Sequence, residues 1–141
     1  MFRNILVPVD LTELNIAKAA IEQAAELATQ SGGAVRLLNV QSLLPATFMD
    51  YVPADFDAEM KANAETSLNH VADKVPLPRE RVSSVVRLGG IYPEILSEAD
   101  ACGADLIVIG SHRPAMSTYL LGSNAKTVVR HAKCSVLVVR A

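Results

Sequence analysis

Short apolar runs alternate with longer amphipathic segments along the chain, and this alternation limits the possible folds more than any other feature. The runs are rich in Val, Ile and Leu and lack polar alternation, which is typical of strands buried on both faces of a parallel sheet. They lie at residues 5–9, 34–40, 82–88, 105–110 and 135–140. We expect one strand at each of these runs.

The segments between the runs carry apolar residues at steps of three and four, the spacing of a helix that packs on a core. The first shows this most clearly, because Ala17, Ile21, Ala24 and Ala28 fall on one face. Helices are expected over residues 12–31, 56–75, 93–99 and 122–131. Strands that alternate with helices imply right-handed crossovers. We therefore predict a single α/β domain over residues 1–141, a doubly wound five-stranded parallel sheet in the order 3-2-1-4-5 with helices on both faces.

The composition narrows the class of protein. Half of the 141 residues are hydrophobic and a fifth are charged, which supports a buried core and argues against intrinsic disorder. The net charge of -2 gives no basic surface, so nucleic acid is not an expected partner. Residues 1–9 lack the features of a secretory signal, and no apolar run is long enough to span a bilayer. We expect a cytoplasmic protein without a membrane partner.

Several familiar site patterns are absent from the sequence. Cys102 and Cys134 have neither CxxC spacing nor a histidine at ligand spacing, so we expect two reduced and mostly buried thiols. The three histidines, His70, His112 and His131, are far apart in the chain, which argues against a metal site among them. No G-x-x-x-x-G-K-[ST] run is present, so efficient hydrolysis of a nucleotide is not expected.

The connection between the fourth strand and the fourth helix is the segment most informative about function. Eleven residues separate Gly110 from Gly122, more than the two to six usual for such a connection. Glycines at both ends allow the backbone to approach a ligand closely. The amides of Gly122, Ser123 and Asn124 at the helix start would form an anion site suited to phosphate. The plainer alternative is that Ser123 or Asn124 only caps the helix.

Polar residues at the ends of two strands are further candidate site residues. Ser111, His112 and Arg113 follow the fourth strand, and the latter two could donate charge-assisted hydrogen bonds to the same phosphates. Asp10 ends the first strand, where a carboxylate can accept hydrogen bonds from ribose hydroxyls across the crevice. As an isolated residue, Asp10 could equally cap the following helix. Residues 41–54 are more apolar than a connection needs, and we expect them to cover something.

These residues resemble the nucleotide-binding motif of the universal stress protein family, and the resemblance covers the whole chain. ATP-binding members carry two glycines separated by two residues, then nine residues, then a Gly-Ser or Gly-Thr pair. Gly110, Gly122 and Ser123 match this pattern. Arg113 stands at the second glycine, and only eight residues separate it from Gly122. The segment is also similar to a bacterial branch whose members are regarded as nucleotide binders.

The resemblance implies a ligand, ATP, with Mg²⁺ as the candidate metal on its phosphates, and a role for individual residues. Asp10 would hold the ribose, the backbone around Val40 would meet the adenine, and Gly110 would pack beneath the ribose. The remaining implied contacts are Pro8 and Val9 in the crevice and the amides of Gly122, Ser123 and Asn124 at the phosphates. Two interpretations of Arg113 stay open: it closes the phosphate channel, or it binds the phosphates by a guanidinium fork, which we favour.

The last strand lies at one edge of the sheet in the predicted order. A flat apolar edge left bare invites pairing with another chain. The family resemblance implies the same arrangement, a homodimer that pairs through Ser135 to Arg140 about a two-fold axis.

Three functions are compatible with these features. The leading hypothesis is a nucleotide-binding stress-response or regulatory protein whose ATP state alters its oligomer or a partner interaction. The first alternative is a slow ATPase or nucleotidyl-transfer enzyme in the same pocket, with His112 or Asp10 as the proton acceptor. The second alternative is a dimeric interaction module with an empty pocket, in which Arg113 has abolished binding. The sequence contains no catalytic constellation, so binding is favoured over turnover.

Overall fold

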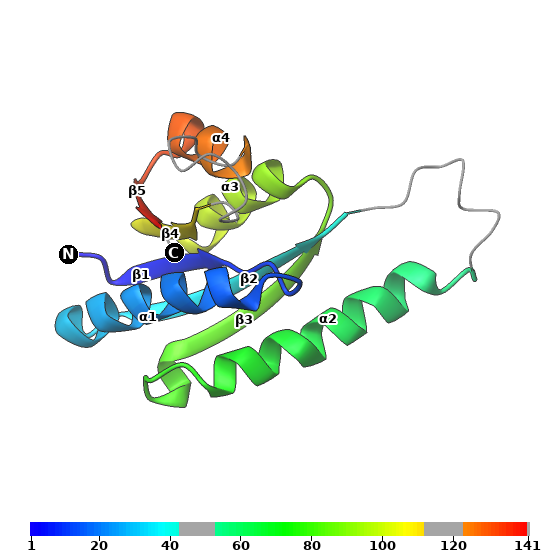
Figure 1. Cartoon of the computed structure of the whole chain (residues 1–141), viewed down its shortest axis with the longest axis horizontal. Coiled ribbons are helices and arrows are strands. Elements are labelled where there is room, and N and C mark those ends of the chain that lie inside the picture. Colours follow the sequence, from blue (N-terminus) through cyan, green and yellow to red (C-terminus); the bar gives the residue numbers. More distant parts are fainter. Residues whose placement is uncertain (43–52, 112–122, 141) are drawn as a thin grey trace.

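Five parallel strands form the sheet of the protein, whose computed structural model describes residues 1–42, 53–111 and 123–140 (Figure 1). The strands are hydrogen-bonded in the order β3-β2-β1-β4-β5, which confirms the predicted fold class and strand order. Their bounds are β1 (Asn4–Pro8), β2 (Ala34–Gln41), β3 (Val82–Leu88), β4 (Leu106–Gly110) and β5 (Ser135–Val139).

In the described part of the chain, four α-helices cover the two faces of this sheet. They are α1 (Leu14–Ser31), α2 (Phe56–Asp73), α3 (Ile91–Cys102) and α4 (Ser123–His131), with a 3-10 turn, η2 (Arg79–Arg81), before β3. Helices α1 and α2 lie on one face, and α3 and α4 lie on the other (Figure 1). None of the helices in the described ranges combines the length and the apolar character that a membrane span requires.

Several helix ends differ from the sequence prediction by one to three residues, and hydrogen bonds explain two of these differences. Helix α3 begins at Ile91 rather than at Pro93, because extended Gly90 accepts a hydrogen bond from the Glu94 amide at 3.1 Å. Helix α2 ends at Asp73 rather than near Val75, because the Val75 amide bonds to the Ala72 carbonyl and tightens the last turn. Val75 is still buried, so the predicted apolar stripe continues into the turn beyond the helix.

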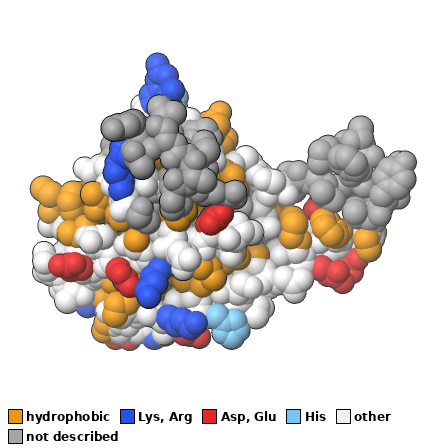
Figure 2. All heavy atoms as spheres, in the orientation of Figure 1, with side chains coloured by type: hydrophobic (Ala, Val, Ile, Leu, Met, Phe, Trp, Pro, Cys, Tyr) orange, Lys and Arg blue, Asp and Glu red, His pale blue; other side chains and the backbone are white. Residues whose placement is uncertain are grey.

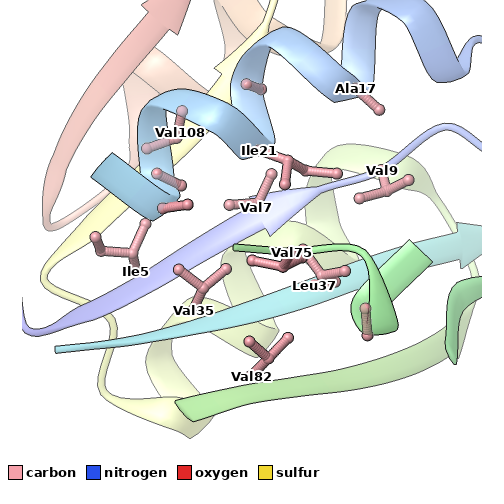
Figure 3. Packing of buried hydrophobic residues seen from close by; sticks show 14 of the residues in the cluster. Ile5, Val7, Val9, Ala17, Ile21, Val35, Leu37, Val75, Val82 and Val108 are labelled. Atoms are coloured by element: carbon pink, nitrogen blue, oxygen red, sulfur yellow. The ribbon is translucent and has the colours of Figure 1, made fainter. Parts of the chain in front are cut away.

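The core consists of two layers, one on each side of the sheet. Alternate residues of a strand point to opposite faces, so β1 directs Val7 toward α1 and Leu6 toward α3 and α4. Ile21 of α1 points toward Val7 in Figure 3. Burying each side chain of this size stabilises the fold by about 1.5–3 kcal/mol. With both faces covered, the carboxyl ends of the strands are the part of the sheet left open to a ligand.

Candidate functional site

A cavity of about 490 Å³ lies where the strand order changes direction, between the carboxyl ends of β1 and β4. This is the position at which doubly wound sheets bind ligands, and the volume falls in the usual range for small-molecule sites. Seven of the residues predicted from the sequence line it: Pro8, Val9, Asp10, Val40, Gly110, Ser111 and Asn124. The fold therefore brings together residues that are widely separated in the chain.

The remaining predicted residues cannot be placed in the same way. His112, Arg113 and Gly122 lie outside the described residues, as do positions 43–52 of the segment expected to cover the site. Ser123 begins α4, but its side chain is not among the described parts of the chain. Their roles stay predictions.

Asp10 is held by a local turn and does not cap the helix after it. Its Oδ1 accepts hydrogen bonds from the Thr12 amide at 2.9 Å and from the Thr12 hydroxyl at 2.6 Å. The N-cap position of α1 is Glu13 instead. Asp10 Oδ2 receives no hydrogen bond from the described residues. The turn thus fixes one of the two carboxylate oxygens of a residue that lines the cavity.

The backbone of Val40 faces the cavity because β1 ends before β2 does. Among the described residues, the last backbone hydrogen bond between the two chain segments runs from the Val9 amide to the Leu38 carbonyl at 2.7 Å. In a parallel sheet the amide and carbonyl of every second residue point to the same side. Val40 therefore directs an N–H donor and a C=O acceptor past the end of β1.

Two polar side chains of β2 that the sequence analysis missed also line the cavity. Asn39 is only 3% exposed, and its Nδ2 donates to the Val9 carbonyl at 2.9 Å. Gln41 donates from Nε2 to Asn39 Oδ1 at 2.6 Å. Gln41, together with Leu11, also borders a second cavity of about 340 Å³ beside α2. The available signal was a polar residue near the end of the strand, where Asn39 follows two leucines.

Gly110 has a packing role that the sequence did not reveal. A Cβ atom at this position would lie 2.5 Å from Ile16 Cγ2 and 3.2 Å from the Ile16 carbonyl oxygen of α1. The glycine is thus required for α1 to approach β4, whatever occupies the cavity.

Helix α3 supplies an apolar wall through Ile91 and Ile95. Further along the same helix, an ion-pair network ties α3 to β2 and β3. Glu98, 4% exposed, accepts from Arg36 Nε at 2.8 Å and from Arg87 Nη1 at 2.9 Å.

Arg87 also links the first turns of α3 to β3. Its Nε donates to Glu94 Oε1 at 2.8 Å. The hydrogen bonds to Glu94 and Glu98 raise the pKa of the Arg87 guanidinium, so it is a permanent cation between the two carboxylates. The network fixes α3, and with it the apolar wall, against the sheet.

The other residues that line the cavity lie at the ends of strands or around the starts of α1 and α4. They are Leu11, Thr12, Glu13, Ala17, Leu38, Ser42, Ile109 and Ala125, with Ile16 described above. None of them was predicted as a site residue. That prediction used strand-end polar residues, glycine spacing and the family resemblance, whereas the walls of the cavity depend on how the helices approach the sheet.

On the face seen in Figure 2, acidic and basic side chains of the described residues lie interspersed. Asn124 and Ala125, in the first turn of α4, bring the amide-rich end of that helix to the cavity.

The cysteines lie away from the cavity that contains Asp10. Both are free thiols of intermediate burial, and both pack against the core layer formed by α3 and α4. Burial still raises the pKa of the Cys102 and Cys134 thiols. Among the described residues, no three His, Cys, Asp or Glu side chains are grouped to hold a metal ion.

Comparison of the sequence with a family model and with known proteins finds the same family. The model of the family described as "Universal stress protein family" matches residues 1–140. Universal stress protein G of Escherichia coli O157:H7 is 36% identical over 143 residues, covering 99% of this chain and 100% of the relative.

Solved structures share the fold. Universal stress protein UspA from Lactobacillus plantarum has a TM-score of 0.80 at 28% identity, covering 99% of this chain and 98% of that one. A universal stress protein in complex with cAMP has a TM-score of 0.67 at 18% identity, covering 98% of this chain and 97% of that one. At that identity the second likeness shows the fold alone.

Proposed function

This chain belongs to the universal stress protein family, and from that premise we propose that it is a stress-response protein whose cavity binds an adenine nucleotide, ATP. The observation that carries the proposal is the meeting of Asp10 and the start of α4 in one cavity. A nucleoside polyphosphate needs acceptors for its ribose hydroxyls at one end and donors for its phosphates at the other. The cavity offers both.

Each part of the nucleotide has a matching group. Asp10 Oδ2 accepts from the ribose hydroxyls, and the Val40 amide and carbonyl pair with the edge of the adenine. Pro8, Val9 and Ser111 line the crevice between these two contacts. Gly110 lies beneath the ribose. Ile91 and Ile95 give the base an apolar wall.

The phosphates belong at the start of α4, where free amides and the positive end of the helix dipole favour negative charge. Gly122, Ser123 and Asn124 supply these amides, and His112 and Arg113 add charge-assisted donors. Mg²⁺ is the candidate metal and would be held by the phosphates and water, since this ion rarely takes a cage made entirely of protein ligands.

The nucleotide signal is transmitted, in this proposal, through a homodimer. Strand β5 follows α4 directly and, within the described part of the chain, pairs only with β4. Leu137 on this edge strand is 36% exposed. Pairing of β5 with its copy would cover the edge, and a nucleotide at the start of α4 would bias that contact. We propose that the protein acts in the cytoplasm, where ATP is abundant.

The decisive experiment identifies the ligand and its fate. Mass spectrometry of the nucleotide that co-purifies with the protein is followed by calorimetric titration of the stripped protein with ATP. Intact ATP and a saturable titration are expected. Bound ADP with phosphate released over time would support a slow ATPase instead. No binding at millimolar ATP would support an interaction module with an empty pocket.

A further inference from the structure

The two cysteines lie in the core layer formed by α3 and α4, at the amino ends of the strands. Cys102 is the last residue of α3, and Cys134 directly precedes β5. Both thiols are free, and both pack against the same cluster of buried residues. They are thus at the opposite end of the strands from the cavity that contains Asp10.

The sheet register brings the two cysteines together although they are far apart in the chain. Strand β4 pairs with β5 so that Leu106 is opposite Ser135. Cys134 therefore lies near Asp105, which follows Cys102 closely in the chain. The pKa of the Cys134 thiol reflects these neighbours, because burial raises it most and the nearby Asp105 and Cys102 are among the groups that raise it further.

A cavity of about 290 Å³ beside the ends of α3 and α4 gives the two thiols room to move. Cys134 is part of its wall, and so is Ala99. Cys102 Sγ donates a weak hydrogen bond to the Ala99 carbonyl oxygen at 3.9 Å, so both cysteines adjoin the same residue. Ala104 and Ala132 also line the cavity, and such short side chains leave space around the thiols.

We propose that Cys102 and Cys134 form a reversible intramolecular disulfide when the protein meets hydrogen peroxide. One thiolate attacks the peroxide, so that an S–O bond forms, the O–O bond breaks and hydroxide leaves. The other thiolate attacks this sulfur, so that the S–S bond forms, the S–O bond breaks and a second hydroxide leaves. The two thiol protons convert both hydroxides to water, and the peroxide is reduced by two electrons.

The raised pKa of both thiols determines when this reaction takes place. Burial keeps Cys102 and Cys134 protonated near neutral pH, and a protonated thiol is a poor nucleophile. The thiols therefore stay reduced until peroxide is abundant. This inference is independent of the proposed function, because it needs no nucleotide.

The disulfide would close a loop of the chain that contains β4 and α4. Gly110, Ser111 and Asn124, which line the cavity at the carboxyl ends of the strands, belong to this loop. A cross-link stabilises a folded protein mainly by restricting the unfolded chain. Oxidation would therefore oppose the opening of α4 and preserve the cavity under oxidative conditions.

The test treats the reduced, folded protein with excess hydrogen peroxide and blocks the remaining thiols. Mass spectrometry of a digest made without reductant should show one cross-linked peptide pair that joins Cys102 to Cys134, and dithiothreitol should restore both thiols. The melting temperature of the oxidised protein should rise by about 5–10 °C. Hydrogen exchange of the α4 amides should become slower.

The single variants Cys102→Ser and Cys134→Ser are the matched controls. Neither can form the bond, and both keep the four methionines of the chain, which peroxide also oxidises. Their melting temperatures should not rise after the same treatment. The corresponding alanine variants replace them if thermal denaturation shows that a serine variant does not fold.

Three results would overturn the proposal. The first is oxidation of the two cysteines to sulfinic or sulfonic acids without a cross-link. The second is a disulfide that joins two copies of the chain, which non-reducing electrophoresis would reveal as a dimer. The third is a cross-linked monomer whose melting temperature equals that of the reduced protein, which would exclude the stabilising role. None of these results bears on ATP binding, which the calorimetric titration tests separately.

Discussion

Gly110 at the end of β4 touches Ile16 of α1 so closely that a methyl group on the glycine would come within 2.5 Å of Ile16 Cγ2. This contact sets how near α1 lies to the strand end that borders the cavity. The same two residues line the cavity, so the packing of the core and the shape of the site are determined together.

Gly110→Ala should destabilise the protein by about 1–3 kcal/mol, because the added methyl overpacks the contact with Ile16. Urea denaturation of Gly110→Ala, Ile16→Ala and the double variant measures the coupling. The double variant should recover part of the loss, since removing Ile16 Cγ2 makes room. Gly103→Ala is the control, because no atom lies within 4 Å of its Cβ and only backbone strain applies. Additive losses in the double variant would contradict the contact.

Asp10→Ala should weaken ATP binding at least about tenfold, because removal of the carboxylate eliminates a charge-assisted hydrogen bond to the ribose. Calorimetric titration measures the change. Asp100→Ala deletes the same charge from α3, where the carboxylate lies 3.7 Å from Lys133 and outside the cavity, and should leave the affinity unchanged. Equal affinities of the wild-type protein and Asp10→Ala would remove Asp10 from the site.

Glu98→Gln should lower the free energy of unfolding by about 1–3 kcal/mol, less than for a fully buried pair because both arginines are partly exposed. The loss arises because Arg36 and Arg87 keep their charges without the shared carboxylate. Glu22→Gln, on the surface of α1 and 4.0 Å from Lys18, should change stability by less than about 0.5 kcal/mol. Chemical denaturation of both variants is the measurement, and equal effects would argue against the network.

The thiols should make stability depend on pH in the alkaline range. Burial raises the pKa of Cys102 and Cys134 in the folded state, so the folded protein holds these protons more tightly than the unfolded chain does. Their contribution is complete below the unfolded pKa of about 8.5 and is lost as the pH rises through the folded-state pKa. The wild-type protein should therefore lose more stability than the Cys102→Ala/Cys134→Ala variant when urea denaturation is repeated above that pH. Parallel pH profiles would show that the thiols do not contribute.

Leu137→Arg should shift the proposed dimer toward monomer, because a charge would be placed in the middle of the β5 edge. Sedimentation velocity at several protein concentrations measures the shift. Leu14→Arg is the matched control, since Leu14 is also an exposed leucine but lies at the start of α1. A monomeric wild-type protein, or an unchanged dimer in Leu137→Arg, would rule out this interface.

The sequence was informative about the site wherever a polar residue ended an apolar strand. Asp10 stood out for this reason, and the cavity includes it. Ile91 was not singled out, because an apolar residue at a helix start has no local signature of a binding wall. Asn39 was missed because its partner, the Val9 carbonyl, lies just beyond the end of β1, a segment far from Asn39 in the chain.

The sequence by itself determined the order of elements and the faces they bury, because apolar spacing reflects local backbone geometry and the alternation of strands with helices leaves few topologies. Only the tertiary structure decided which groups share the cavity, why residue 110 must be glycine and which way the Gln41 amide points. These depend on contacts between segments far apart in the chain, such as Gly110 with Ile16 and Asn39 with Val9. Such contacts exist only once the helices have packed on the sheet.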